Sequence, residues 1–157
     1  MFRGASLSAL CQHAVANVYG IDTFGGDGTP AYYRQGGEWI KWWENKAGHS
    51  HDFADDLKTA HLAAPTAEII VGDTARVGRE WDREPVGLLY VDADHSYEGV
   101  KRDFEAWSPN LAPGAVVIFD DYRHMVRGKD HYPGVTHFVD SLDLPIERIG
   151  KAALVRP

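Results

Sequence analysis

The chain has 157 residues, of which 44% are hydrophobic and 25% charged, with a formal net charge of −7. These proportions predict one globular domain, residues 1–157, and the negative charge argues against nucleic acid as a partner. Cys11 stands alone, the N-terminal run MFRGASLSALCQHAVA is too polar for a secretion signal, and no segment is apolar enough to span a membrane. We therefore expect a cytoplasmic protein with a small-molecule substrate.

Short apolar runs alternate with segments of helical spacing. In chain order, the patterns predict a helix at 6–16, a strand at 17–22, a loop at 23–30, mostly helix at 31–64, a strand at 68–73, a helix at 74–81, a strand at 87–92 buried on both faces, a helix at 96–107 capped by Ser96, a turn at 108–114, a strand at 115–120, a helix at 134–142 and a hairpin around Gly150. This alternation indicates an α/β fold with a mostly parallel sheet, helices on both faces and a C-terminal antiparallel hairpin.

Four of the predicted strands end in an aspartate, namely Asp22, Asp73, Asp92 and Asp120. Ligands of open α/β sheets bind beyond the carboxyl ends of the strands. A single aspartate there is explained by helix capping or a turn. Four of them at the same edge favour a binding site.

Three acids in the second half of the chain have the spacing of a cation site. Asp92 and Asp120 end neighbouring strands, so that they and Asp121 can converge on one hard cation such as Mg²⁺. The alternative is a turn in which one acid caps and the other is solvated. Asp94 is an alternative ligand to Asp92, because strand alternation decides which of them points inwards.

Two histidines and a tryptophan cluster have both functional and structural interpretations. His95 is either a general base or a hydrogen-bonded residue at a helix start. His124 either joins the site or lies in a surface loop, the interpretation we favour. The three tryptophans of WIKWW (39–43) either cover a bound molecule or pack on the sheet.

The motif DADHSYE (92–98), followed by Trp107, the turn PNLAPG (109–114) and the Asp120–Asp121 pair, resembles class I S-adenosylmethionine-dependent methyltransferases, and within them methyltransferase family 24. The resemblance implies a Rossmann-like fold and methyl transfer from S-adenosylmethionine to a hydroxyl of a small molecule, such as a sugar or secondary metabolite. It also implies Mg²⁺ as a second cofactor, as in metal-dependent relatives. The site residues that it implies are Gly4, Ser6, Asp22, Thr23, Asp73 and Thr74 for the cofactor, with Asp27 as a weaker candidate, Asp92 and His95 for catalysis, and Asp92, Asp120 and Asp121 for the metal.

The chain departs from this family at its beginning. Relatives open with a strand and a glycine loop of the form E-x-G-x-x-x-G-x-S, whereas here only Gly4-Ala5-Ser6 matches the end of that loop. Because a missing central strand leaves its neighbours without hydrogen-bond partners, three explanations stay open. The sequence is a fragment or has a misassigned start, the flanking strands pair directly, or another chain fills the gap, as in a homo-oligomer.

Two other functions remain as alternatives. Asp92-Ala93-Asp94 also has the D-x-D form of a metal-dependent glycosyltransferase, which holds a nucleotide diphosphate through Mn²⁺. The incomplete glycine loop fits a catalytically inactive relative that serves as a scaffold.

Overall fold

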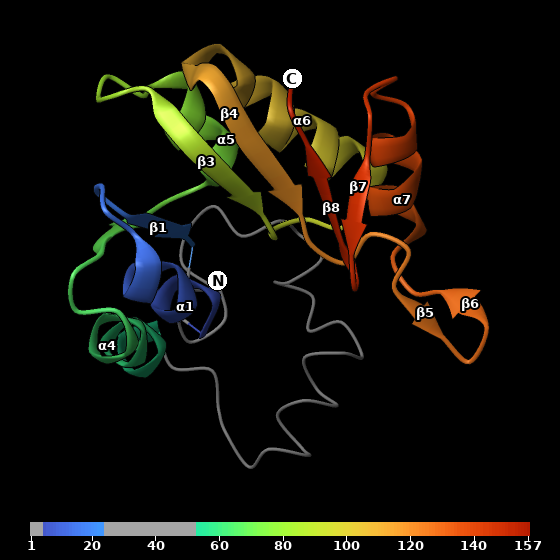
Figure 1. Cartoon of the computed structure of the whole chain (residues 1–157). Coiled ribbons are helices and arrows are strands. Elements are labelled where there is room, and N and C mark those ends of the chain that lie inside the picture. Colours follow the sequence, from blue (N-terminus) through green and yellow to red (C-terminus); the bar gives the residue numbers. More distant parts are fainter. Residues whose placement is uncertain (1–4, 24–52) are drawn as a thin grey trace. The chain divides into compact units, whose positions relative to one another are not determined.

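The computed structural model describes residues 5–23 and 53–157, which belong to two compact units, residues 1–74 and 75–157 (Figure 1). Strands and helices alternate along the described chain, and an antiparallel hairpin closes it, which is the predicted α/β organisation. Gly4, Asp27 and the tryptophans of residues 39–43 lie outside the described residues. Among the described helices, none combines the length and the apolar character that a membrane span requires.

The described part of the first unit contains a parallel pair of strands and two helices. Its described elements are α1 (Ala5–His13), β1 (Tyr19–Asp22), α4 (Phe53–Ala63) and β2 (Glu68–Val71). β1 and β2 pair in parallel, with Tyr19 opposite Glu68 and Asp22 opposite Val71. The backbone N–H of Gly72 donates to the Asp22 carbonyl at 2.9 Å, which extends the pairing past the strand ends. The carboxyl ends of both strands therefore lie at one edge.

The second unit contains a four-stranded sheet in the order β3-β4-β8-β7. Its elements are α5 (Thr74–Arg79, which begins at the unit boundary), β3 (Val86–Val91), α6 (Tyr97–Trp107), the 3₁₀ helix η2 (Ser108–Asn110), β4 (Leu111–Phe119), β5 (Met125–Val126), β6 (Lys129–Asp130), α7 (Pro133–Asp140), β7 (Glu147–Ile149) and β8 (Ala152–Val155). β3 and β4 are parallel, whereas β8 is antiparallel to both β4 and β7. The predicted C-terminal hairpin is confirmed.

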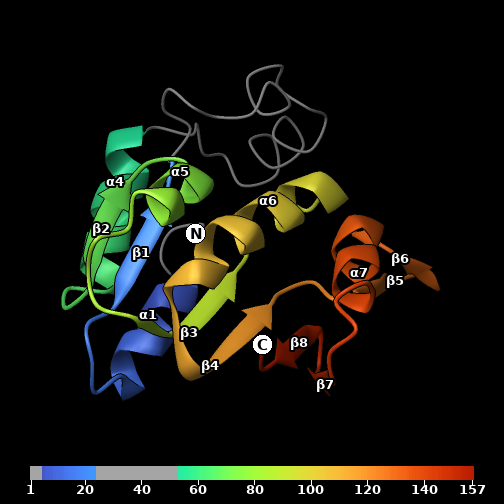
Figure 2. The ribbon, with the colours of Figure 1, turned by 90° about the horizontal axis from the view of Figure 1, so that it is seen from above.

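Helices α6 and α7 contact each other on one face of this sheet (Figure 2). The core between them and the sheet includes the buried side chains of Val100, Val117, Phe119 and Val139. Phe119 and Phe138 pack with ring centroids 5.8 Å apart, which joins the central strand to α7. This core fixes the ends of β3 and β4, where the predicted acids lie.

Three details differ from the predicted elements. The segment 108–114 was predicted as a turn but forms η2 and the first part of β4. The register of the β3–β4 pairing shifts between the Val86–Leu111 and Leu88–Val116 pairs, so the Pro-Gly sequence is accommodated in an irregular part of the strand. β3 is not buried on both faces, because Leu88 is 46% exposed and burial is reached only at Val91, where the core begins. The short β5–β6 hairpin was not predicted.

Candidate active site

The loop after β3 is held by local hydrogen bonds before α6 begins. The Asp94 carboxylate accepts the backbone N–H of Ser96 at 2.8 Å, and the Ser96 hydroxyl oxygen accepts the N–H of Gly99 at 3.0 Å. The predicted cap is confirmed. A Cβ at Gly99 would lie 2.2 Å from Cγ of Asp94, so glycine is required for Asp94 to lie over the helix start. Asp94 is thus a structural residue of this loop, and the loop presents Asp92 and His95.

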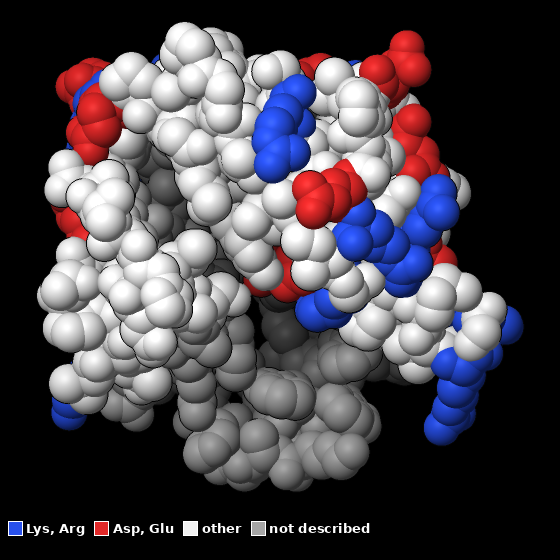
Figure 3. Space-filling view, in the orientation of Figure 1, with Lys and Arg blue, Asp and Glu red and all other residues white. Residues whose placement is uncertain are grey.

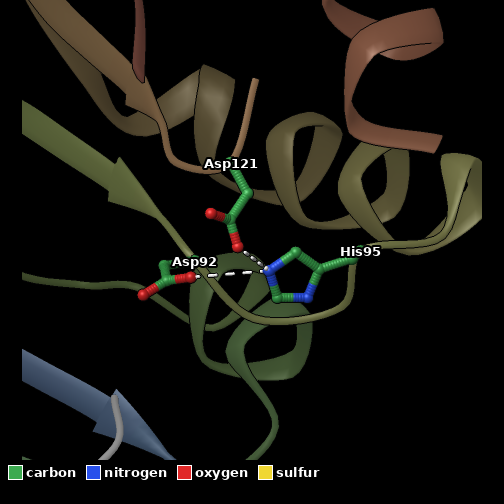
Figure 4. A group of neighbouring side chains, drawn as sticks. All are labelled: Asp92, His95 and Asp121. Carbon is green, nitrogen blue, oxygen red and sulfur yellow. Dashed lines mark hydrogen bonds and ion pairs between the residues drawn. The ribbon is translucent and has the colours of Figure 1, made fainter. Parts of the chain in front are cut away.

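The loop after β4 brings a second acid to the same place. The backbone N–H of Asp120 donates to the Val91 carbonyl at 3.1 Å, which aligns the ends of the two strands. Asp121 then adopts a left-handed conformation, with φ of 57°, a region in which aspartate is enriched among non-glycine residues. Its Oδ2 lies 3.0 Å from Nε2 of His95, and Oδ1 of Asp92 lies 3.7 Å from the same nitrogen (Figure 4).

A histidine and a lysine approach the other oxygen of Asp121. Nδ1 of His124 lies 3.0 Å from Oδ1, and Nζ of Lys151 lies 2.6 Å from it. The Asp121 side chain is only 9% exposed, so these contacts replace most of its hydration. His124 lies in a loop with its side chain 34% exposed, as we favoured, and its ring also contacts the acid at the centre of the cluster.

An aromatic ring fixes the plane of the His95 imidazole. The His95 and Tyr132 ring centroids are 4.2 Å apart, with 31° between the planes. Tyr132 precedes α7, and a Cβ at Gly134 in the first turn of that helix would lie 2.5 Å from the His95 carbonyl oxygen. The start of α7 therefore packs directly against the His95 loop and restricts its position.

The pKa values of the two acids that face His95 are shifted in opposite directions. Burial, together with the nearby Asp120 carboxylate, raises the pKa of Asp92 above its ordinary value. Burial alone would also raise the pKa of Asp121, but the Lys151 ammonium and the two imidazoles outweigh it, and the pKa is lowered. Asp121 stays ionised over the physiological range, whereas Asp92 accepts a proton more readily.

Comparison with known proteins identifies the family. The model of methyltransferase family 24, which describes a methyltransferase domain, matches residues 1–122. The chain belongs to this family. Over 123 residues it is 30% identical to the uncharacterized protein y4gI of Sinorhizobium fredii (strain NBRC 101917 / NGR234), a match that covers 75% of this chain. The chain spans 12% of the length of that relative.

Solved structures establish the methyltransferase fold. The O-methyltransferase NovP superposes with a TM-score of 0.61 at 14% identity, covering 99% of this chain and 68% of NovP. CalS11, a TDP-rhamnose 3'-O-methyltransferase of calicheamicin biosynthesis, gives a TM-score of 0.54 at 18% identity, covering 98% of this chain and 67% of CalS11. The predicted Rossmann-like α/β class is thereby confirmed.

Among residues 5–23 and 53–157 of this methyltransferase domain, one group of donors fits a divalent cation. One atom each from Asp92, His95 and Asp121 lies within 4.8 Å of the others, and two carboxylates with an imidazole are ligands that divalent metals accept. Asp120, the third predicted ligand, lines a small cavity of about 10 Å³ with Asp92 and His95, space for about one water molecule. Its carboxylate also contacts Lys151, at 3.3 Å.

The predicted cofactor residues that the structure describes belong to other elements. Ser6 lies in α1; Asp22 ends β1 and Thr23 follows it; Asp73 and Thr74 lie just after β2. The parallel register brings Asp22 next to the Gly72-Asp73 turn, as expected for two acids at the ends of neighbouring strands. Their role in binding the cofactor stays a prediction.

Lys151 and Tyr132 were missed by the sequence interpretation. A signal for Lys151 existed, because β8 pairs antiparallel with β4 and Phe119 lies opposite Ala153. The same register, continued by two residues, places residue 151 opposite residue 121. Tyr132 gave no comparable signal, since its position depends on where the connection between β6 and α7 returns to the sheet.

Proposed function

We propose that this chain is the catalytic part of an S-adenosylmethionine-dependent methyltransferase that acts on a hydroxyl group of a small molecule. The observation that carries the proposal is the Asp92–His95–Asp121 cluster at the carboxyl ends of two parallel strands, in a chain that belongs to a methyltransferase family. The reaction forms a bond between the acceptor oxygen and the methyl carbon and breaks the bond from that carbon to sulfur. The acceptor proton must leave, so the site needs a base.

His95 serves as this base in our proposal, and Asp121 positions it. An ionised Asp121 accepts a hydrogen bond from Nε2–H of His95, which leaves Nδ1 with the free electron pair that takes the proton. Stacking on Tyr132 holds the His95 ring in one plane, so the ring keeps the orientation that proton transfer requires. The imidazolium that forms is stabilised by Asp121 at 3.0 Å and by Asp92 at 3.7 Å.

A divalent cation is compatible with the same donors. Asp92, His95 and Asp121 are the residues that would hold it, and a bound ion would lower the pKa of the acceptor hydroxyl. Nε2 of His95 cannot both donate to Asp121 and ligate an ion. The metal-free and the ion-bound site therefore use this imidazole in different ways.

A hydroxyl of a sugar or of a secondary metabolite is the acceptor class that we infer. CalS11 acts on a TDP-linked rhamnose according to its name, and the present chain shares its fold. The D-x-D glycosyltransferase alternative is disfavoured, because Asp94 is engaged by the N–H of Ser96 and does not belong to the group of converging donors.

The test is transfer of a labelled methyl group from S-adenosylmethionine to a panel of hydroxyl acceptors, including TDP-sugars and catechols. His95→Gln should lower kcat/KM by roughly 10²- to 10⁴-fold, the usual contribution of a general base. His137→Gln, a change to an exposed histidine of α7, is the matched control and should leave the rate unchanged. Equal rates for His95→Gln and the wild type would refute the assignment of the base.

A further inference from the structure

Lys151 places a fixed positive charge on the acid pair that was predicted to bind metal. Its Nζ lies 2.6 Å from Oδ1 of Asp121 and 3.3 Å from the Asp120 carboxylate. One ammonium group thus bridges two of the three predicted metal ligands. None of the sequence motifs that indicated the site includes this lysine.

The position of Lys151 follows from the C-terminal hairpin. Gly150 has φ of 60° at the turn, and the Arg148 Nε–H donates to the Gly150 carbonyl at 2.9 Å. Pairing of β8 with β4 then aligns residue 151 with the end of β4.

Basic side chains gather around acidic ones on the side of this unit that carries β7, β8 and the β5–β6 hairpin (Figure 3). The backbone is fixed, but the Lys151 side chain is 52% exposed and can leave the acids without a change of fold.

The ammonium shares Asp121 with the candidate cation site. Asp121 offers Oδ2 to the Asp92–His95–Asp121 group and Oδ1 to Lys151. The nearby negative charges of Asp92, Asp120 and Asp121 are already partly neutralised by the lysine. A lysine ammonium is positively charged at neutral pH, so its contacts with Asp121 and Asp120 are contacts between opposite charges.

We propose that Lys151 sets the cation requirement of this site by competing with a divalent ion for Asp120 and Asp121. With the lysine in place, the site keeps Asp121 paired and the His95 base oriented, and Mg²⁺ or Mn²⁺ binds weakly. When the lysine is removed, Asp120 becomes an additional carboxylate ligand and the repulsion between ammonium and ion disappears. This inference deepens the proposed function, on which its catalytic meaning rests.

The expected effect is large enough to measure. One unit charge about 5 Å from a divalent ion changes the affinity for that ion by roughly tenfold, even with water-like screening. Release of the Asp120 carboxylate adds a ligand and increases this factor. We therefore expect Lys151→Met to bind Mn²⁺ at least about tenfold more tightly than the wild type.

The experiment is titration of the full chain with Mn²⁺, followed by the electron paramagnetic resonance signal of the free ion. Lys151→Arg keeps the charge and should bind as weakly as the wild type. Lys129→Met removes an exposed charge of β6 and should change the affinity by less than twofold. Adding Asp120→Asn to Lys151→Met should reverse much of the gain. Equal Mn²⁺ affinity of Lys151→Met and the wild type would overturn the proposal.

A second measurement uses the unaltered protein and does not depend on the folding of a variant. Mn²⁺ should displace the ammonium, so acetylation of Lys151 by acetic anhydride, followed by mass spectrometry, should accelerate when Mn²⁺ saturates the site. An unchanged acetylation rate at saturating Mn²⁺ would count against competition. Both readouts need neither cofactor nor acceptor, so a failure of methyl transfer would leave this inference standing, and the reverse also holds.

Discussion

Asp121→Asn removes one charge from the centre of the site while keeping the size of the side chain. The carboxylate is 9% exposed and contacts Lys151 at 2.6 Å, His95 at 3.0 Å and His124 at 3.0 Å. Charge-assisted hydrogen bonds contribute roughly 1.5–3 kcal/mol each when buried, but all three partners are at least one quarter exposed and the amide keeps one acceptor. We expect a net loss of about 2–3 kcal/mol, or roughly 5–10 °C in Tm for a chain of this size.

The pH dependence of this loss follows from the lowered pKa of Asp121. The stabilisation is fully present above the ordinary aspartate pKa of 3.8 and disappears as the pH falls through the lower pKa of the folded state. Thermal unfolding followed by circular dichroism at pH 7, 5 and 3 should show a large difference between wild type and variant at pH 7 that shrinks at pH 3.

The matched control is Asp82→Asn, which removes an exposed acid from the α5–β3 loop and should leave Tm unchanged. Equal Tm values for Asp121→Asn and the wild type at pH 7 would refute the reasoning. A difference that persists undiminished below pH 3.8 would refute it as well, because protonation of the unfolded state and then of Asp121 itself must reduce the stabilisation.

Two further substitutions test the loop after β3. Asp92→Asn should raise the free energy of unfolding by about 1 kcal/mol at pH 7, because burial and the Asp120 carboxylate disfavour the charged form of Asp92. This gain in stability should vanish below pH 4 in the same thermal unfolding experiments. A lower Tm for the variant than for the wild type at pH 7 would contradict the prediction. Gly99→Ala places a Cβ 2.2 Å from Cγ of Asp94 and should lower the free energy of unfolding, measured by chemical denaturation, by about 2–3 kcal/mol. Gly87→Ala, where no atom lies within 4 Å of the added Cβ, is the control and should not destabilise the protein. Equal denaturation midpoints for the two variants would exclude the steric explanation.

The sequence predicted the strands that carry the site because their signals are local. Short apolar runs followed by aspartate indicated β1 to β4, and the Ser96 cap fixed the start of α6. The β5–β6 hairpin was missed, since its strands have two residues each. Its turn uses positive φ at both Arg127 and Gly128, and arginine is not a typical residue for that conformation.

Long-range register accounts for what the sequence interpretation missed in the site. Asp92, His95 and Asp121 follow neighbouring parallel strands, so their meeting could be expected from strand order alone. Lys151 reaches Asp121 through the antiparallel return of β8, which requires the exact pairing with β4. The contact of the Asp120–Asp121 pair with the Lys151 ammonium therefore depends on tertiary structure and was not visible in the motif.

The central claim, that this chain is a methyltransferase that uses S-adenosylmethionine, is tested most directly by calorimetric titration with S-adenosylhomocysteine. We predict saturable binding to the wild type, strong weakening in Asp22→Asn, which changes a predicted cofactor residue, and retained binding in Asp121→Asn. Absence of any binding heat with the folded wild-type chain would contradict the account.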